Sequence, residues 1–115
     1  MVKRSGNYET QVNENMRGGE GSVRIESLLS NNELNDKGRL FAKITLPPGC
    51  SIGHHVHEGE MESYHIISGE GEYNDNGETM KLFAGDTTHT PSGEGHGIKN
   101  SGSEPLMLIA LILYK

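Results

Sequence analysis

The chain has 115 residues, enough for one compact domain, and carries 10 Lys and Arg against 16 Asp and Glu, a formal charge of -6 with neutral histidines. This acidic balance, without a basic cluster, argues against nucleic acid and anionic membranes as partners. A single cysteine, Cys50, excludes an intrachain disulfide. Because no secretory signal and no apolar stretch of about 20 residues is evident, we expect a soluble cytoplasmic protein.

Residues 1–21 are polar and glycine-rich and show no hydrophobic periodicity, so we expect a flexible N-terminal arm ahead of a folded domain at residues 22–115. Beyond the arm, short segments of alternating apolar and polar residues are separated by Gly, Pro and Asn turns, which is the pattern of β-strands. The predicted strands span residues 23–28, 40–46, 62–73, 80–83, 87–90, 96–99 and 105–114. No segment repeats apolar residues at helical spacing, which predicts an all-β sandwich, jelly roll or barrel.

Three local features refine this pattern. Gly69 and Gly71 interrupt the segment 62–73 and predict a bend or bulge within a strand. The dipeptide Asn76-Gly77 predicts a hairpin turn, because both residues tolerate positive φ. The segment 105–114 is apolar at nearly every position, which predicts a strand buried on both faces.

The six histidines are concentrated between residues 54 and 96. His55 and His57 are two residues apart, so on a strand their imidazoles point to the same face. Glu62 begins the next predicted strand and is placed to bring a carboxylate back beside them, while His96 arrives from a distant hairpin. Three neutral imidazoles and one carboxylate suit a divalent transition metal (Mn, Fe, Ni, Co, Cu or Zn).

Glycines and a proline surround these candidate ligands at fixed spacings. Two motifs, G-x5-H-x-H-x4-E-x6-G and G-x5-P-x-G-x2-H-x3-N, are matched at every fixed position. The matching residues are Gly49, His55, His57, Glu62 and Gly69 in the first, and Gly85, Pro91, Gly93, His96 and Asn100 in the second. In these motifs the sequence resembles the cupin superfamily, and in particular small single-domain bacterial cupins. The resemblance implies a jelly-roll β-barrel (double-stranded β-helix), metal ligands at His55, His57, Glu62 and His96, and a structural role for Asn100.

Tyr64 has the same strand parity as Glu62 and is therefore predicted to project into the barrel. There its hydroxyl could hydrogen-bond a bound ligand, although core packing explains the residue equally well. The opposite parity of His65 and His54 points them away from the site. His89 precedes the proline of the second motif and is expected outside the metal site.

A divalent metal with one carboxylate and three neutral histidines keeps positive charge and open positions, which favours a small bidentate anion such as a dicarboxylate. Resemblance to small cupins, some of which bind oxalate-like anions, leads to the same interpretation. Whether the protein is an enzyme stays open. A decarboxylase would need an acid or base near the metal, for which Glu58, Glu60 and Glu94 are candidates although solvation explains them more simply.

Three other functions remain as alternatives: a dioxygenase, a sugar or sugar-phosphate isomerase or epimerase, and a binding module without catalysis. The isomerase is weakened because few cationic residues accompany the motifs to hold a phosphate. We also expect a homodimer, because the core of so short a chain is thin, the last strand is apolar, and cupins usually form dimers.

Overall fold

The computed structural model describes residues 1–115 as ten strands and one three-residue 3-10 turn. The elements are β1 (Glu9–Glu14), η1 (Met16–Gly18), β2 (Ser22–Leu29), β3 (Gly38–Leu46), β4 (Ser51–Val56), β5 (Glu60–Ser68), β6 (Glu70–Asp75), β7 (Glu78–Phe83), β8 (Thr87–Thr90), β9 (Gly95–Asn100) and β10 (Leu106–Tyr114). No helix long and apolar enough to cross a lipid bilayer is present.

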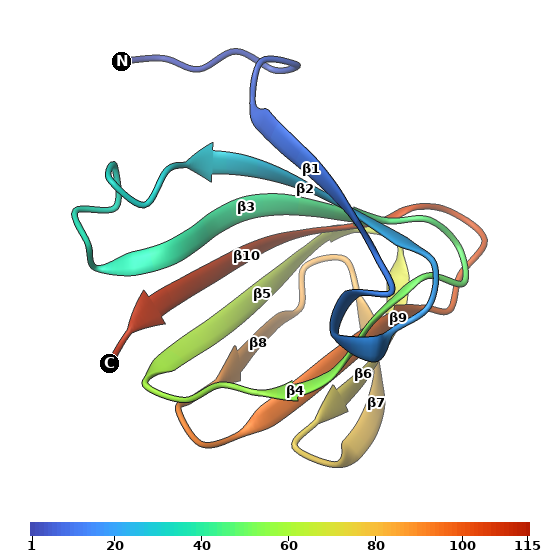
Figure 1. The fold of residues 1–115 in the computed structure, drawn as a ribbon. Helices are drawn as coiled ribbons and strands as arrows, with labels where there is room; N and C mark the ends of the chain where they lie inside the picture. Colours follow the sequence, from blue (N-terminus) through green and yellow to red (C-terminus); the bar gives the residue numbers. More distant parts are fainter.

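The strands form two antiparallel sheets, as Figure 1 shows. The larger sheet has the order β1-β2-β3-β10-β5-β8, and the smaller has the order β4-β9-β6-β7. After β3 the chain alternates between the two sheets, except that β6 and β7 form a hairpin within the smaller one, and this is the winding of a jelly-roll barrel. The predicted all-β fold is confirmed.

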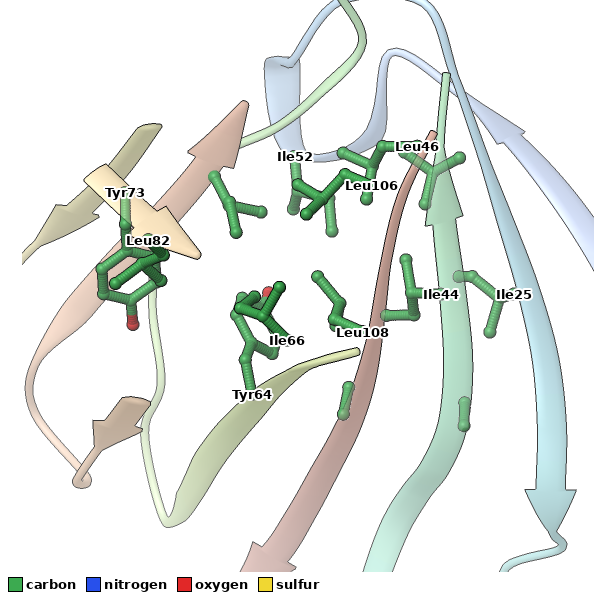
Figure 2. Close-up of a cluster of buried hydrophobic side chains, with 14 residues drawn as sticks. Ile25, Ile44, Leu46, Ile52, Tyr64, Ile66, Tyr73, Leu82, Leu106 and Leu108 are labelled. Carbon is green, nitrogen blue, oxygen red and sulfur yellow. The ribbon is translucent and has the colours of Figure 1, made fainter. Parts of the chain in front are cut away.

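A single apolar cluster fills the space between the two sheets (Figure 2). Its fourteen buried side chains are Val23, Ile25, Ala42, Ile44, Leu46, Ile52, Tyr64, Ile66, Tyr73, Leu82, Ile98, Leu106, Leu108 and Ala110. Most occupy alternate positions of their strands, so each strand turns one face inward. Each fully buried Ile or Leu contributes about 1.5–3 kcal/mol to folding, so this cluster holds the two sheets together.

The predicted strand at 62–73 is wrong as a single element, because the chain changes sheets at Gly69. β5 pairs with β10 and β8 in the larger sheet, whereas β6 pairs with β9 and β7 in the smaller one. Gly69 has a φ of 85°, and a Cβ atom there would lie 2.6 Å from the carbonyl oxygen of Pro105. Glycine therefore permits a crossing that a side chain would obstruct.

β10 lies in the interior of the larger sheet, between β3 and β5. Its inner face is buried through Leu106, Leu108, Ala110 and Ile112. The alternate residues, Met107, Ile109, Leu111 and Leu113, are only half-buried on the outer face. The prediction that this strand is buried on both faces is therefore wrong. Within the single chain, its outer face is only half-buried.

The first 21 residues contain a strand that their composition did not predict. β1 pairs with β2 over six residues, from Glu9 opposite Ser27 to Glu14 opposite Ser22. Its side chains are polar and mostly exposed, so no hydrophobic alternation marks it. η1 then packs against β4, so the chain's start reaches from the edge of one sheet to the other (Figure 1).

Two predicted local features are confirmed. Asn76 and Gly77 have φ values of 51° and 100° and form the turn between β6 and β7. The buried Asn100 amide donates hydrogen bonds to the carbonyl oxygens of Leu46 and Glu104, each at 2.8 Å. This second-motif asparagine thus ties together the chain segments at the end of the barrel, which is a structural role.

Candidate metal centre

Four side chains from both sheets converge at one point inside the barrel. His55 is near the end of β4, His57 lies just beyond it, Glu62 is in β5, and His96 is in β9. Each offers one ligand atom, and these atoms all lie within 4.8 Å of one another. The pairing of β4 with β9 places His55 directly opposite His96. The four residues singled out in the sequence are therefore brought together.

The Oε1 atom of Glu62 is the centre of this cluster. It lies 2.8 Å from Nε2 of His96, 2.9 Å from Nε2 of His57 and 3.8 Å from Nε2 of His55. The Nε2 atoms of His57 and His96 are 3.1 Å apart. All three imidazoles thus direct the same ring nitrogen toward one carboxylate oxygen.

The other ring nitrogen of each histidine has a protein partner. Nδ1 of His55 donates to the carbonyl oxygen of Gly53 at 2.8 Å, and Nδ1 of His57 donates to Oε2 of Glu60 at 2.7 Å. Nδ1 of His96 lies 2.8 Å from the hydroxyl of Tyr73. For His55 and His57, outward donation through Nδ1 leaves the Nε2 lone pair for the centre, as in metal-binding histidines.

The electrostatics favour an ionised carboxylate at the centre of the cluster. Burial alone would raise the pKa of Glu62, but its contacts with the three histidines outweigh burial and lower that pKa. Burial lowers the pKa of His96 despite the nearby carboxylate. The hydrogen bond to Glu62 raises the pKa of His57 against the effect of its burial. One negative charge therefore lies within three imidazoles.

This donor set fits a divalent transition metal. Ligand atoms that share such an ion at about 2.0–2.2 Å lie about 3–3.5 Å apart, close to the 2.8–3.8 Å separations between Glu62 and the histidines. Nitrogen-rich sites of this kind suit Mn, Fe, Co, Ni, Cu and Zn, whereas Mg and Ca prefer oxygen ligands.

Glu60 has a position that its sequence context did not reveal. Solvation was the simplest expectation for this loop glutamate, but its side chain is only 13% exposed. Arg39 donates to both of its carboxylate oxygens, from Nε and Nη2, each at 2.8 Å. Glu60 in turn accepts from His57. Arg39 lies 21 residues away in β3, so no local motif could have indicated this chain of contacts.

A cavity of about 240 Å³ opens beside the cluster. Half of its lining residues are apolar, and the chain's start supplies part of its wall. The lining residues are Gln11, Asn13, Met16, Arg17, Ile25, Arg39, Leu40, Ile44, Ile52, His55, His57, Glu62, Tyr64 and Ile112. The contribution of β1 and η1 was missed because nothing in their sequence marks them as part of a site.

Tyr64 faces the interior, as its strand parity predicts. It is 1% exposed, it lines the cavity, and its ring stacks on that of His96 with 4.8 Å between centroids and 22° between planes. Burial raises the pKa of Tyr64 well above its usual range, so the phenol stays neutral. By contrast, His54, His65 and His89 are exposed and lie outside the cluster.

Comparisons with known proteins point to one family. The model of the cupin domain family, Cupin_2, matches residues 42–112. An oxalate-binding protein of Thermotoga maritima is 47% identical over 113 residues, which cover 98% of this chain and 93% of that protein.

Solved structures show the same likeness. The crystal structure of a predicted oxalate decarboxylase from Thermotoga maritima matches with a TM-score of 0.96 and 46% identity, over all of both chains. A Cupin 2 conserved barrel domain protein from Salinispora arenicola matches with a TM-score of 0.76 over 98% of this chain and 87% of that one. Its identity of 21% makes this second likeness one of fold alone.

Proposed function

Since the chain belongs to the cupin domain family, we propose that it holds one divalent transition metal and binds a small carboxylate anion such as oxalate at that metal. His55, His57, Glu62 and His96 would be the ligands, and Tyr64 would contact the anion. The observation that carries this proposal is the convergence of three Nε2 atoms on Glu62 beside a small cavity. The oxalate-binding relative supports the choice of anion.

The metal, when bound, supplies the positive charge that attracts carboxylate oxygens. The protein's own residues restrict what can approach. A volume of about 240 Å³ admits only a small ligand, and apolar side chains such as Ile25, Ile44 and Ile112 form half of its lining. Charge interactions are stronger in such surroundings than in water. The neutral Tyr64 phenol can donate a hydrogen bond without adding a negative charge.

The cavity favours binding over acid–base turnover. Glu62 is the sole carboxylate among the lining residues, and it belongs to the proposed ligand set. Glu60 is engaged by Arg39 and His57. A decarboxylase needs a proton donor near the reacting carbon, and no uncommitted carboxyl group lines the cavity. We therefore propose a binding protein, with decarboxylase or dioxygenase activity as the enzymatic alternatives.

Metal content tests the ligand set directly. Protein purified without chelator is expected to contain close to one transition-metal ion per chain by elemental analysis. His57→Ala should lose most of it, because the substitution removes a donor from a set of four. His54→Ala is the matched control, since His54 is a nearby exposed histidine outside the cluster. Equal metal content in His57→Ala and His54→Ala would contradict the proposed site.

Calorimetric titration of oxalate into the metal-loaded protein tests the anion. Saturable binding that disappears in metal-free protein is expected, because the metal holds the carboxylate. Formation of formate and carbon dioxide from oxalate would instead identify a decarboxylase. Metal-dependent oxygen uptake would identify a dioxygenase.

A further inference from the structure

Arg17 is a cation at the cavity whose role the proposed ligand set does not explain. It belongs to η1, outside both cupin motifs, and its side chain lines the same cavity as His55, His57 and Glu62. Arg39 is the other arginine in the lining, but Glu60 already holds it through two hydrogen bonds. Arg17 is exposed to solvent, and its side chain forms no ion pair or hydrogen bond with the rest of the chain. It is therefore the arginine of the cavity lining that is free to bind a ligand.

The backbone that carries Arg17 is held in place by close contacts. A Cβ atom at Gly53 would collide with the carbonyl oxygen of Arg17, so η1 packs directly on the main chain of β4. Beside this contact, the amide of Ser51 donates to the carbonyl oxygen of Glu20 at 2.8 Å. The amide of Glu20 donates in turn to the Ser51 hydroxyl at 2.8 Å. These contacts fix the turn over the smaller sheet.

The backbone of Arg17 is itself unfavourable for this residue type. Its φ of 54° and ψ of 32° lie in the left-handed region, which suits glycine far better than a residue with a Cβ atom. Strained residues of this kind persist where the surrounding structure imposes them, and they cluster at ligand-binding sites. Asn15 in the same turn has the same left-handed conformation, so the packing of this turn against β4 imposes the backbone that carries Arg17.

Arg17 is exposed to solvent and also lines the cavity, so its charge is available to an anion that enters from outside. Because the chain as a whole carries a charge of -6, an approaching anion meets general repulsion. A free guanidinium at the cavity offsets this locally and matches the two oxygens of a carboxylate.

We infer that Arg17 recognises the second carboxylate of a small dicarboxylate whose first carboxylate occupies the metal centre. The inference rests on the proposed function and deepens it. It assigns the discrimination between dicarboxylates and monocarboxylates to a residue near the start of the chain. Arg17 is in this sense a specificity residue, distinct from the four metal ligands.

The experiment compares the metal-loaded wild type with Arg17→Gln and Arg17→Gly by calorimetric titration of oxalate, malonate, succinate and acetate. Both variants should bind the wild type's preferred dicarboxylate about ten- to hundred-fold more weakly, as expected for the loss of a charge-assisted hydrogen bond. Acetate binding and metal content should be unchanged. Arg24→Gln makes the same charge change at an exposed arginine of β2 outside the cavity, and its affinities should stay within about two-fold of the wild type.

Thermal unfolding separates recognition from a structural role. Arg17→Gly should unfold at the same or a higher temperature than the wild type without ligand, because glycine adopts this φ without strain. Weaker dicarboxylate binding together with undiminished stability supports recognition. A parallel loss of stability and binding would assign Arg17 a structural role and overturn the inference.

The binding data also distinguish the two proposals. If Arg17→Gln binds the preferred dicarboxylate as tightly as the wild type, or weakens acetate equally, the inference fails while the proposed function stands. If the metal-loaded wild type binds none of the four anions, both fail.

Discussion

Glu60 lies between a cation and a proposed metal ligand. Arg39 holds its carboxylate from one side, and His57 donates to it from the other. The hydrogen bond from Arg39 is the largest cause that lowers the pKa of Glu60, so its charge persists next to His57. A fixed carboxylate at Nδ1 orients the imidazole and makes Nε2 a better donor to a metal.

Replacing Glu60 should therefore weaken metal binding without removing a ligand. We expect Glu60→Gln to lower metal affinity about 10- to 100-fold, the usual effect of losing an outer partner of a metal-bound histidine. Competition with a chelator of known affinity measures the change. Glu58→Gln is the matched control, because Glu58 is an exposed glutamate two residues earlier, in the turn that precedes β5. A similar affinity loss in Glu58→Gln would show that general charge, rather than the contact with His57, matters.

The residue-level site was predictable only in part. His55, His57, Glu62 and His96 stand at fixed spacings within two motifs, and their ligand atoms converge as those spacings imply. Arg39 and Arg17 stand in no motif, because their positions depend on β3 and η1 packing beside the motif strands. Contacts between segments distant in sequence leave no local pattern to recognise.

At the scale of elements, the change of sheet after β5 shapes the barrel. β5 carries Glu62 and Tyr64 on its inner face, and β6 carries Tyr73, which contacts His96 of the neighbouring strand β9 in the smaller sheet. The buried positions change phase across Gly69, from Glu62, Tyr64 and Ile66 to Gly71 and Tyr73, but the segment after Gly69 has too few apolar residues for the sequence to show this. β1 was missed because its exposed, mostly polar side chains show no alternation at all.

The tight crossing makes Gly69 more sensitive to an added side chain than Gly77, whose φ is also positive but which lies in open space. Gly69→Ala should lower the free energy of unfolding by about 1–2 kcal/mol for its backbone conformation, and by about 1–3 kcal/mol more for the clash with Pro105. Gly77→Ala is the control, because Gly77 has a φ of 100° but no atom within 4 Å of an added Cβ. Chemical denaturation measures both. Equal losses would mean that the close approach at Pro105 carries no energetic cost.

At the scale of the molecule, the outer face of the larger sheet exposes apolar side chains beside the central strand. Leu111 of β10 lies opposite Phe41 of β3 and Ser63 of β5, and Ile67 of β5 is 45% exposed. A small domain with such a face gains stability by covering it. This arrangement agrees with the homodimer expected from the sequence, which stays a prediction.

Light scattering tests the dimer. We expect a mass of twice the chain's 12.5 kDa for the wild type, and the single-chain mass for Leu111→Lys, because a charge on this face must be desolvated on association. Phe83→Lys places the same charge at an exposed residue of β7 in the other sheet and should leave the dimer intact. Circular dichroism verifies that each variant is folded. A wild type of single-chain mass would refute the prediction.

The metal ligands and one part of the cavity wall come from separate stretches of the chain. The ligands lie within residues 55–96, whereas Gln11, Asn13, Met16 and Arg17 belong to a short segment that precedes both motifs. Exchanging residues 9–18 for those of another barrel would thus alter which molecules enter while the coordination chemistry stays as it is. A fold divided in this way can diversify its ligands through one replaceable edge strand and its following turn.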